Sequence, residues 1–177
     1  MTLSDPVSTF DTAMFRGVMG RFATGVTVVS FMREGEPAGM TVNAFLSVSL
    51  DPPLVLISVR RSSNFVQHVQ VGGRYGVNVL AEAQEHLAAY FARRPDGATK
   101  VAFRDHLGTP LIDASLAHIV ARVVDIHPAG DHLLYIAAIE HLWHGLEARP
   151  LIFFSGKYKQ IHAHEPAIQW NDALDGW

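Results

Sequence analysis

Val26-Thr-Val-Val-Ser-Phe31 is the stretch that decides the fold, because an unbroken run of β-branched and apolar residues is typical of a strand. Glu34-Gly-Glu-Pro37 follows and predicts a turn. Residues 38–45 then predict a second strand. The run Leu54-Val-Leu-Ile-Ser-Val59 predicts a third strand, and its continuous apolar character favours burial on both faces. The beginning of the chain therefore predicts neighbouring strands joined by short connections.

The rest of the chain continues in the same way. Further strands are predicted at residues 75–80, 117–126, 133–142 and 151–154, with a hairpin turn at Pro128-Ala-Gly-Asp131. Three helices are predicted, from Phe10 to about Ala23 after an N-cap at Thr9, from Ser62-Ser63 to near Gly72, and from about Glu82 to Arg93. The strands do not alternate regularly with helices, which argues against a doubly wound sheet. The pattern predicts a mainly β protein, a closed or split antiparallel barrel with a few flanking helices.

Composition indicates one globular domain spanning residues 1–177, since 49% of the residues are hydrophobic and only 18% are charged. We expect a core at about residues 10–161, between an N-terminal arm at 1–8 and a C-terminal arm at 163–177. Aromatic residues in the C-terminal arm suggest that it packs on its own domain or on a partner subunit.

Charge and motif content exclude several classes of function. The net charge of −3 makes nucleic acid an unlikely partner, and no apolar stretch is long enough to predict a membrane span. No secretory signal is recognised, so we expect a cytoplasmic protein. The absence of cysteine excludes disulfides, iron–sulfur clusters and thiolate metal sites. Glycine-rich phosphate-binding loops and the nucleophile elbow are also absent.

Histidine is abundant, with ten residues, but we expect no metal site. His141 and His144 would point to opposite faces of a predicted strand, which suits a single metal ion poorly. His162 and His164 would share a face but lie where the C-terminal arm begins. Surface or packing roles are the favoured interpretation for both pairs.

Two segments could carry chemistry. Arg60-Arg61-Ser62-Ser63 follows a buried strand and opens a helix, so its guanidinium, hydroxyl and N–H groups would suit a phosphate. The alternative is an ordinary serine cap with solvated arginines. Residues 39–53 are rich in small and hydroxyl-bearing residues, which could offer hydrogen-bonding groups to a planar heterocycle or form a simple turn. Composition does not decide between these alternatives.

Five stretches together resemble the flavin reductase-like family, the short-chain NAD(P)H:flavin oxidoreductase components of two-component flavin-dependent monooxygenases. They occur in the family's order between about residues 12 and 161. They are Phe15-Arg-Gly-Val-Met-Gly-Arg-Phe-Ala-Thr-Gly-Val-Thr-Val-Val29, Gly39-Met-Thr-Val-Asn-Ala-Phe45 with Ser47-Val-Ser-Leu-Asp-Pro-Pro-Leu-Val55, Tyr75-Gly-Val-Asn-Val-Leu80, Ala129-Gly-Asp-His132, and Pro150-Leu-Ile-Phe-Phe-Ser-Gly-Lys-Tyr158. The resemblance implies an FMN-binding type of split Greek-key β-barrel and a homodimer.

The resemblance also implies roles for individual positions. Arg60, Arg61, Ser62 and Ser63 would meet the flavin phosphate, and Phe91 and Arg93 would close over the cofactor. His132 would be the catalytic residue on the nicotinamide side, shaped further by Thr24 and Tyr158. The positions implied to lie beside the flavin ring are Thr41, Val42, Asn43, Ala44, Ser47, Val48 and Ser49. The chain departs from the family at Ala44-Phe-Leu-Ser47, where members often carry Ser-Phe-Thr-Ser.

The function implied is reduction of FMN or FAD by NADH or NADPH, with the reduced flavin passing to a partner monooxygenase. Placement of the nicotinamide against the flavin is the main task of such a protein. Two alternatives remain open: a non-catalytic flavin-binding electron carrier, and a flavoenzyme that acts directly on an organic substrate.

Overall fold

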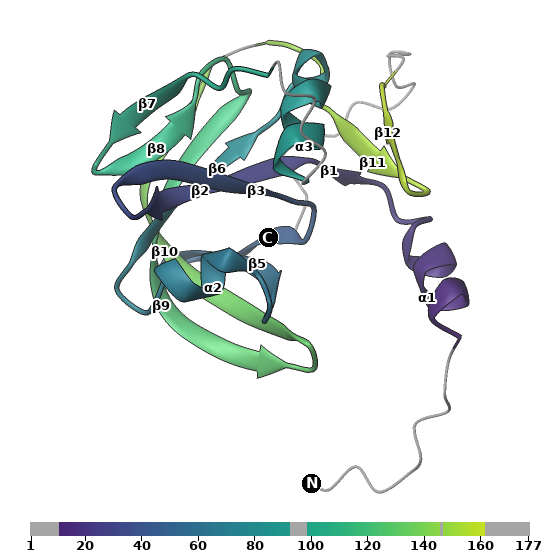
Figure 1. Cartoon of the computed structure of the whole chain (residues 1–177), viewed down its shortest axis with the longest axis horizontal. Helices are drawn as coiled ribbons and strands as arrows, with labels where there is room; N and C mark the ends of the chain where they lie inside the picture. The colour runs from purple at the N-terminus through teal and green to yellow at the C-terminus, as the bar shows by residue number, and fades with distance from the viewer. Residues whose placement is uncertain (1–10, 93–98, 146, 162–177) are drawn as a thin grey trace, which may run out of the picture.

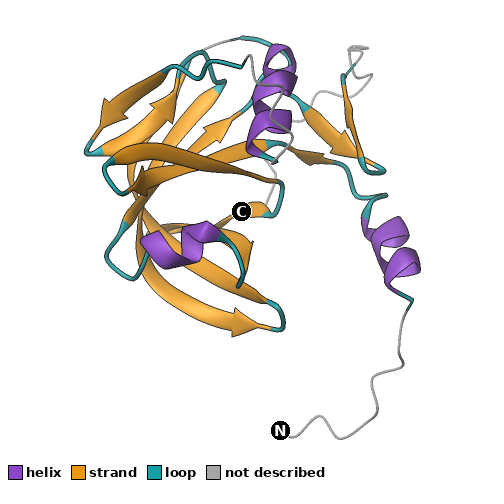
Figure 2. Cartoon of the chain, viewed as in Figure 1, coloured by secondary structure: helices purple, strands orange, loops and turns teal. Residues whose placement is uncertain are grey.

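A seven-stranded antiparallel sheet makes up most of the molecule (Figures 1 and 2). The structure is a computed structural model and describes residues 11–92, 99–145 and 147–161. The strands of the large sheet are β2 (Thr27–Arg33), β3 (Glu36–Val42), β4 (Phe45–Leu50), β5 (Pro53–Arg60), β6 (Arg74–Val79), β9 (Ala117–Ala129) and β10 (His132–His144). They lie in the order β3-β2-β6-β9-β10-β5-β4.

The two edge strands of this sheet are neighbours in the chain. Only Asn43 and Ala44 join the end of β3 to the start of β4, and a link of this length spans about 11 Å at most. The sheet must therefore curl until its two edges come close together. No ladder pairs β3 with β4 within the described residues, so the barrel stays split along this line, here called the seam. The predicted mainly β, split antiparallel barrel is confirmed.

Smaller elements surround the sheet. One three-stranded sheet has the order β1-β11-β12, and a separate hairpin pairs β7 with β8. Their bounds are β1 (Thr24–Gly25), β7 (Phe103–His106), β8 (Thr109–Ile112), β11 (Ile152–Phe154) and β12 (Lys157–Lys159). The helices are α1 (Thr12–Met19), α2 (Asn64–His68), the 3₁₀ turn η1 (Glu82–Gln84) and α3 (Glu85–Phe91).

The short helix α2 contributes the central side chain of the barrel core, Phe65, which is fully buried. Its ring meets Phe31, Tyr75 and Tyr135 edge to face, with centroid distances of 5.1, 5.7 and 5.0 Å. Such contacts add to the free energy gained by burial. Burial raises the pKa of the Tyr75 hydroxyl. The packing of Phe65 fixes the segment just before it, residues 60–63, against the end of the barrel.

One polar side chain inside the sheet joins three strands. Asn78 on β6 is fully buried, and its amide nitrogen donates to the Val28 carbonyl at 2.8 Å and to the Ser30 hydroxyl at 2.9 Å. Its carbonyl accepts from the Ile112 N–H at 2.7 Å. Asn78 therefore ties β6 to β2 and to β8, which explains an asparagine in an otherwise apolar strand.

The first helix differs from its predicted bounds. α1 covers Thr12–Met19 rather than residues 10–23, and its N-cap is Asp11, which accepts from the Ala13 N–H at 3.0 Å. The predicted cap, Thr9, lies outside the described residues. The helix ends early because Gly20 caps it and its carbonyl accepts from the Ser155 N–H, although the apolar period continues to Phe22.

Several strands also differ from expectation. Residues 46–50, part of the segment 39–53 that was expected to form a polar loop or a turn, belong to the edge strand β4, and β1, β7, β8 and β12 were not predicted. In β5, Val55, Ile57 and Val59 are buried while the alternating residues are only half-buried, so the predicted burial on both faces is wrong. On the outward side of β5, Ser58 and Arg60 line the cavity described next.

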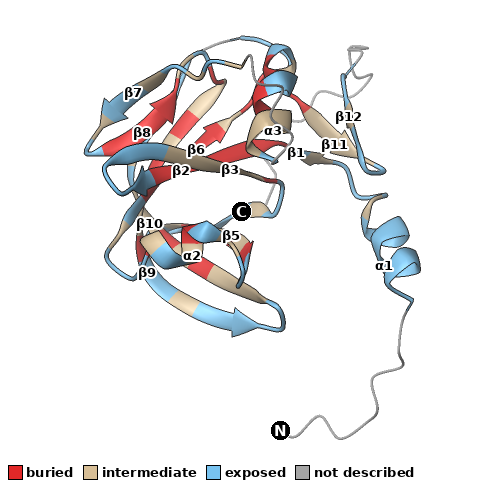
Figure 3. Ribbon diagram, viewed as in Figure 1, coloured by how far each residue is buried: buried red, intermediate tan, exposed pale blue. Residues whose placement is uncertain are grey.

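Helix α1 lies apart from the barrel (Figures 1 and 3). None of its residues is buried, and Met14, Phe15, Val18 and Met19 are each more than half exposed. An apolar stripe of this kind normally covers a neighbouring surface.

Candidate functional site

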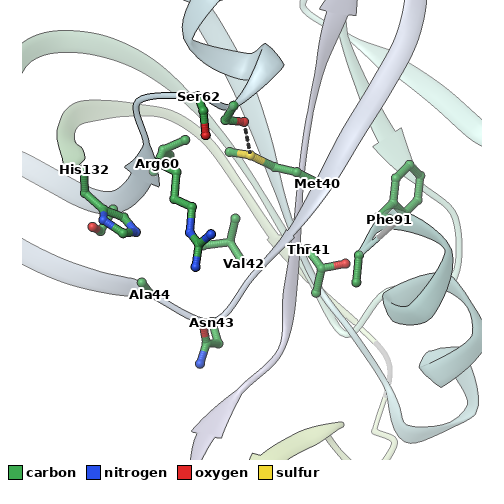
Figure 4. A pocket seen from close by; sticks show the side chains of 13 residues that line it. Met40, Thr41, Val42, Asn43, Ala44, Arg60, Ser62, Phe91 and His132 are labelled. Carbon is green, nitrogen blue, oxygen red and sulfur yellow. Dashed lines mark hydrogen bonds between the residues drawn. The ribbon is translucent and has the colours of Figure 1, made fainter. Parts of the chain in front are cut away.

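A cavity of about 490 Å³ opens at the seam of the barrel (Figure 4). Residues 40–44, from the end of β3 and the link to β4, form one wall. Residues 58–63, except Arg61, together with His132 form another, and Phe91 and Ala92 at the end of α3 complete it. The volume lies within the range of about 300–1,000 Å³ that small-molecule sites occupy.

Most of the residues singled out from the sequence meet in this cavity. The segments that supply them are far apart in the chain and are brought together by the curl of the sheet. The predicted residues that line the cavity are Thr41, Val42, Asn43, Ala44, Arg60, Ser62, Ser63, Phe91 and His132.

The other predicted residues lie elsewhere. The Arg61 side chain is outside the cavity, and its Nε donates to the Gly130 carbonyl at 2.9 Å. Ser47, Val48 and Ser49 lie on the edge strand β4 and do not line this cavity. Arg93 lies outside the described residues.

Two hydroxyl groups at the cavity make hydrogen bonds that stabilise the fold. The Thr41 hydroxyl donates to the Ala88 carbonyl at 2.7 Å, which holds α3 against β3. The Ser63 hydroxyl accepts from the Phe65 N–H at 3.3 Å and so caps α2. The serine-cap interpretation therefore holds for Ser63, but the same residue also lines the cavity. Ser62 makes no such cap, and its side chain is exposed toward the cavity.

Arg60 and His132 are placed together by strand pairing. They are direct partners in the ladder between β5 and β10. Arg60 makes no ion pair within the described part of the chain, but its charge acts on the nearby Asp131 carboxylate. Figure 4 shows Arg60 between His132 and Phe91, which lie on opposite sides of the view.

The turn between β9 and β10 fixes the imidazole of His132. Gly130 has a φ of 62°, a conformation that glycine adopts without strain. The neighbouring Asp131 carboxylate lies 2.8 Å from Nδ1 of His132, and this hydrogen bond lowers the pKa of Asp131. An ionised carboxylate only accepts, so Nδ1 carries the proton of the bond. In the neutral ring, Nε2 is then left as an acceptor.

A second cavity of about 500 Å³ adjoins the first and shares Thr41, Asn43 and Ala92 with it. Tyr158 lines this second cavity, whereas His132 lines only the first. Thr24 on β1 lines neither, and its hydroxyl oxygen is buried without a hydrogen-bond partner in the described structure. Thr24, His132 and Tyr158, the three residues assigned to the nicotinamide side, therefore do not line one common cavity within a single chain.

Sequence reasoning missed several lining residues. Met40 lies inside the quoted motif Gly39 to Phe45, so motif continuity could have identified it. No sequence motif marked Ser58 and Val59 as site residues, because they belong to an apolar strand. They reach the cavity only through the register of β5 with β10. Lys157 of the second cavity lies next to Tyr158 in the last matched stretch.

Comparisons with known proteins agree with this geometry. The family model described as "flavin reductase like domain" matches residues 19–162. An "NADH-dependent flavin reductase" from Rhodococcus sp is 40% identical over 149 residues, which cover 82% of this chain and 84% of that protein. The reductase subunit HsaB of a flavin-dependent monooxygenase from Mycobacterium tuberculosis is 36% identical over 172 residues, covering 94% of this chain and 92% of its own.

Solved structures give the same result. The flavin reductase PheA2 superposes with a TM-score of 0.83 at 41% identity, covering 87% of this chain and all of that one (100%). The NADH:FAD oxidoreductase SgcE6 from Streptomyces globisporus, in complex with NAD and FAD fragments, has a TM-score of 0.82 at 31% identity, with 92% and 100% of the two chains covered.

Proposed function

Because this chain belongs to the flavin reductase-like family, we propose that it transfers hydride from NADH to FMN or FAD and supplies the reduced flavin to a separate monooxygenase. One observation carries the proposal: two motifs that are distant in the sequence, at residues 39–44 and 60–63, line the same cavity as His132. Relatives are named as NADH-dependent reductases and as reductase components of monooxygenases, which supports both the hydride donor and the partner.

The cavity fits a flavin in one orientation. Residues 41–44 offer an extended backbone edge to the ring, while Arg60, Ser62 and Ser63 offer a cation and hydroxyl groups to the phosphate. Arg–phosphate contacts are charge-assisted and favourable. Phe91 packs over the β3 side of the cavity, because Gly39 beneath it has no side chain: a Cβ there would lie 2.9 Å from the Phe91 ring.

The bound flavin supplies the acceptor of the hydride. The residues of the chain position the reactants. With Nδ1 held by Asp131, His132 offers Nε2 to the carboxamide N–H of the nicotinamide and so orients the donor. Tyr158, in the adjoining cavity, bounds the other side of the space above Thr41 and Asn43.

The direct test is turnover with each of the four pairs formed by FMN or FAD with NADH or NADPH, followed by nicotinamide absorbance at limiting flavin. We expect turnover with NADH, and about ten- to hundredfold weaker flavin affinity in Arg60→Ala, since a charged hydrogen bond is worth about 1.5–3 kcal/mol. Arg61→Ala is the matched control, because the Arg61 side chain lies outside the cavity. Absence of turnover with all four pairs would refute the reductase function and favour an electron carrier if flavin still binds.

We further propose that the protein is a homodimer in which α1 packs on a second copy. The support is the apolar stripe of α1, where Met14 and Val18 are 66% and 65% exposed. Sedimentation of the wild type should give a dimer, and Met14→Glu combined with Val18→Glu should shift it toward monomer. Arg16→Gln, on the same helix, should leave the dimer intact. A monomeric wild type would contradict the proposal.

None of the helices in the described part of the chain is long and apolar enough to cross a membrane. We propose the cytoplasm as the site of action, since the proposed reaction consumes NADH and the partner enzyme must receive reduced flavin by diffusion. Fractionation of cells expressing the protein, with the activity followed in each fraction, tests this placement.

A further inference from the structure

Arg61, which follows the last residue of β5, holds the turn between β9 and β10. The ladder between β5 and β10 ends at the pair of Arg60 and His132. Arg61 extends the contact beyond this pair, because its backbone N–H donates to the Asp131 carbonyl at 3.1 Å and its Nε donates to the Gly130 carbonyl at 2.9 Å. These two hydrogen bonds are here called the turn clamp, and both end on the residues that directly precede His132.

The turn clamp fixes the backbone of Asp131 on both sides of its Cα atom. The Gly130 carbonyl belongs to the planar peptide group before Asp131, and the Asp131 carbonyl belongs to the planar group after it. The backbone rotates only between such planes, so a residue that binds both planes holds φ and ψ of Asp131 together. Arg61 thereby sets the direction in which the Asp131 carboxylate leaves the backbone.

The Asp131 carboxylate has no packing of its own to hold it. Its side chain is 87% exposed, yet its Oδ1 lies 2.8 Å from Nδ1 of His132. An exposed pair of this kind gains little free energy by itself, because water screens it and both side chains lose rotamer freedom. A carboxylate on a fixed backbone has less freedom to lose when it accepts from the imidazole. The turn clamp therefore favours the hydrogen bond between Asp131 and His132.

The turn clamp also has a rigid base. Arg61 stands between β5 and α2, where the Ser63 N–H donates to the Arg60 carbonyl at 2.9 Å. The fully buried Phe65 anchors α2 in the barrel core. The same short segment lines the seam cavity with Arg60, Ser62 and Ser63. Arg61 thus ties the wall proposed to bind the flavin phosphate to the turn that carries His132.

We propose that Arg61 is a positioning residue for hydride transfer, acting through Asp131 to hold the imidazole of His132 in the orientation that binds the nicotinamide. The inference rests on the proposed function, because it takes His132 to orient the hydride donor. It gives Arg61 a task different from the contact with the flavin phosphate that the family resemblance implied. Loss of the Arg61 side chain should therefore impair the use of NADH and leave flavin affinity unchanged.

Steady-state kinetics with NADH at saturating FMN test the inference through a double-mutant cycle. We expect Arg61→Ala to lower kcat/KM for NADH about fivefold, the effect of one hydrogen bond, and to leave the FMN dissociation constant unchanged. In a chain that already carries His132→Ala, Arg61→Ala should change kcat/KM less than about twofold, because the residue through which Arg61 acts is gone. Arg61→Lys keeps a donor for the Gly130 carbonyl and should restore most of the rate. Arg21→Ala, which removes an exposed arginine outside the seam cavity, is the control and should leave the kinetics unchanged.

The ¹⁵N chemical shifts of the His132 ring give a readout that does not depend on turnover. In the wild type the neutral ring should carry its proton on Nδ1, because the Asp131 carboxylate only accepts. Arg61→Ala should let the proton redistribute between the two ring nitrogens, whereas Arg61→Lys and Arg21→Ala should retain the wild-type shifts. Unchanged ring shifts in Arg61→Ala would overturn the inference, and so would equal losses of kcat/KM with and without His132. If the wild type turns over no NADH, the proposed function fails, and the ring shifts still decide whether Arg61 holds the Asp131–His132 pair.

Discussion

Replacement of Asn78 by alanine should destabilise the barrel strongly without touching the seam cavity. The variant removes two hydrogen bonds donated by the amide, worth about 1 kcal/mol each. It also leaves the N–H of Ile112 buried and unpaired, which costs about 1–3 kcal/mol. Ser30 keeps a partner, because its hydroxyl donates to the Pro110 carbonyl. The expected loss of unfolding free energy is therefore about 3–5 kcal/mol, a large part of the roughly 5–15 kcal/mol that holds a domain folded.

Urea denaturation followed by far-UV circular dichroism measures this loss, with the slope of free energy against urea checked for constancy. Asn64→Ala is the matched control, since Asn64 is exposed at the start of α2, and it should change stability by less than about 0.5 kcal/mol. Hydrogen exchange should show that protection at Ile112 falls first, because its N–H loses its acceptor. A loss of unfolding free energy below about 1 kcal/mol, with an unchanged dependence on urea concentration, would refute this reasoning. It would mean that the groups bonded to Asn78 find other hydrogen-bond partners.

Two further predictions concern single ionisable groups. His132→Ala should lower the NADH-dependent rate about tenfold, the equivalent of one hydrogen bond, with flavin affinity nearly unchanged. His127→Ala on the same hairpin is the control, and equal loss of rate and flavin affinity would mean that His132 is structural. For Glu140, the hydrogen bond from Arg74 holds the pKa below its usual value, with a further contribution from Arg122. Its stabilising effect is therefore complete above the ordinary glutamate pKa of about 4.3 and is lost as pH falls below it. Glu140→Gln should flatten the fall of stability between about pH 5 and 3, and an unchanged slope would contradict the assignment.

Several elements were predictable because their signal is local. The β-branched run at residues 26–31 and the turn at 128–131 specify strands and a hairpin wherever they stand in a chain. The strand β4 was not predictable in this way. Its serine-rich sequence resembles a loop, and it becomes a strand because β5 offers it an unpaired edge. The early end of α1 likewise depends on a contact between Gly20 and Ser155, far away in sequence.

The amino-acid sequence alone determined that the protein is a mainly β domain with the motifs of a flavin reductase, because strand propensity and short motifs are properties of neighbouring residues. Only the tertiary structure decided which motif residues share a cavity. Arg60 meets His132 through the register of β5 with β10, and residues 41–44 meet both because a two-residue link forces the edges of the sheet together. Register and curvature are set by the packing of the whole sheet, so no local pattern could place Arg61 outside the cavity or Ser58 inside it.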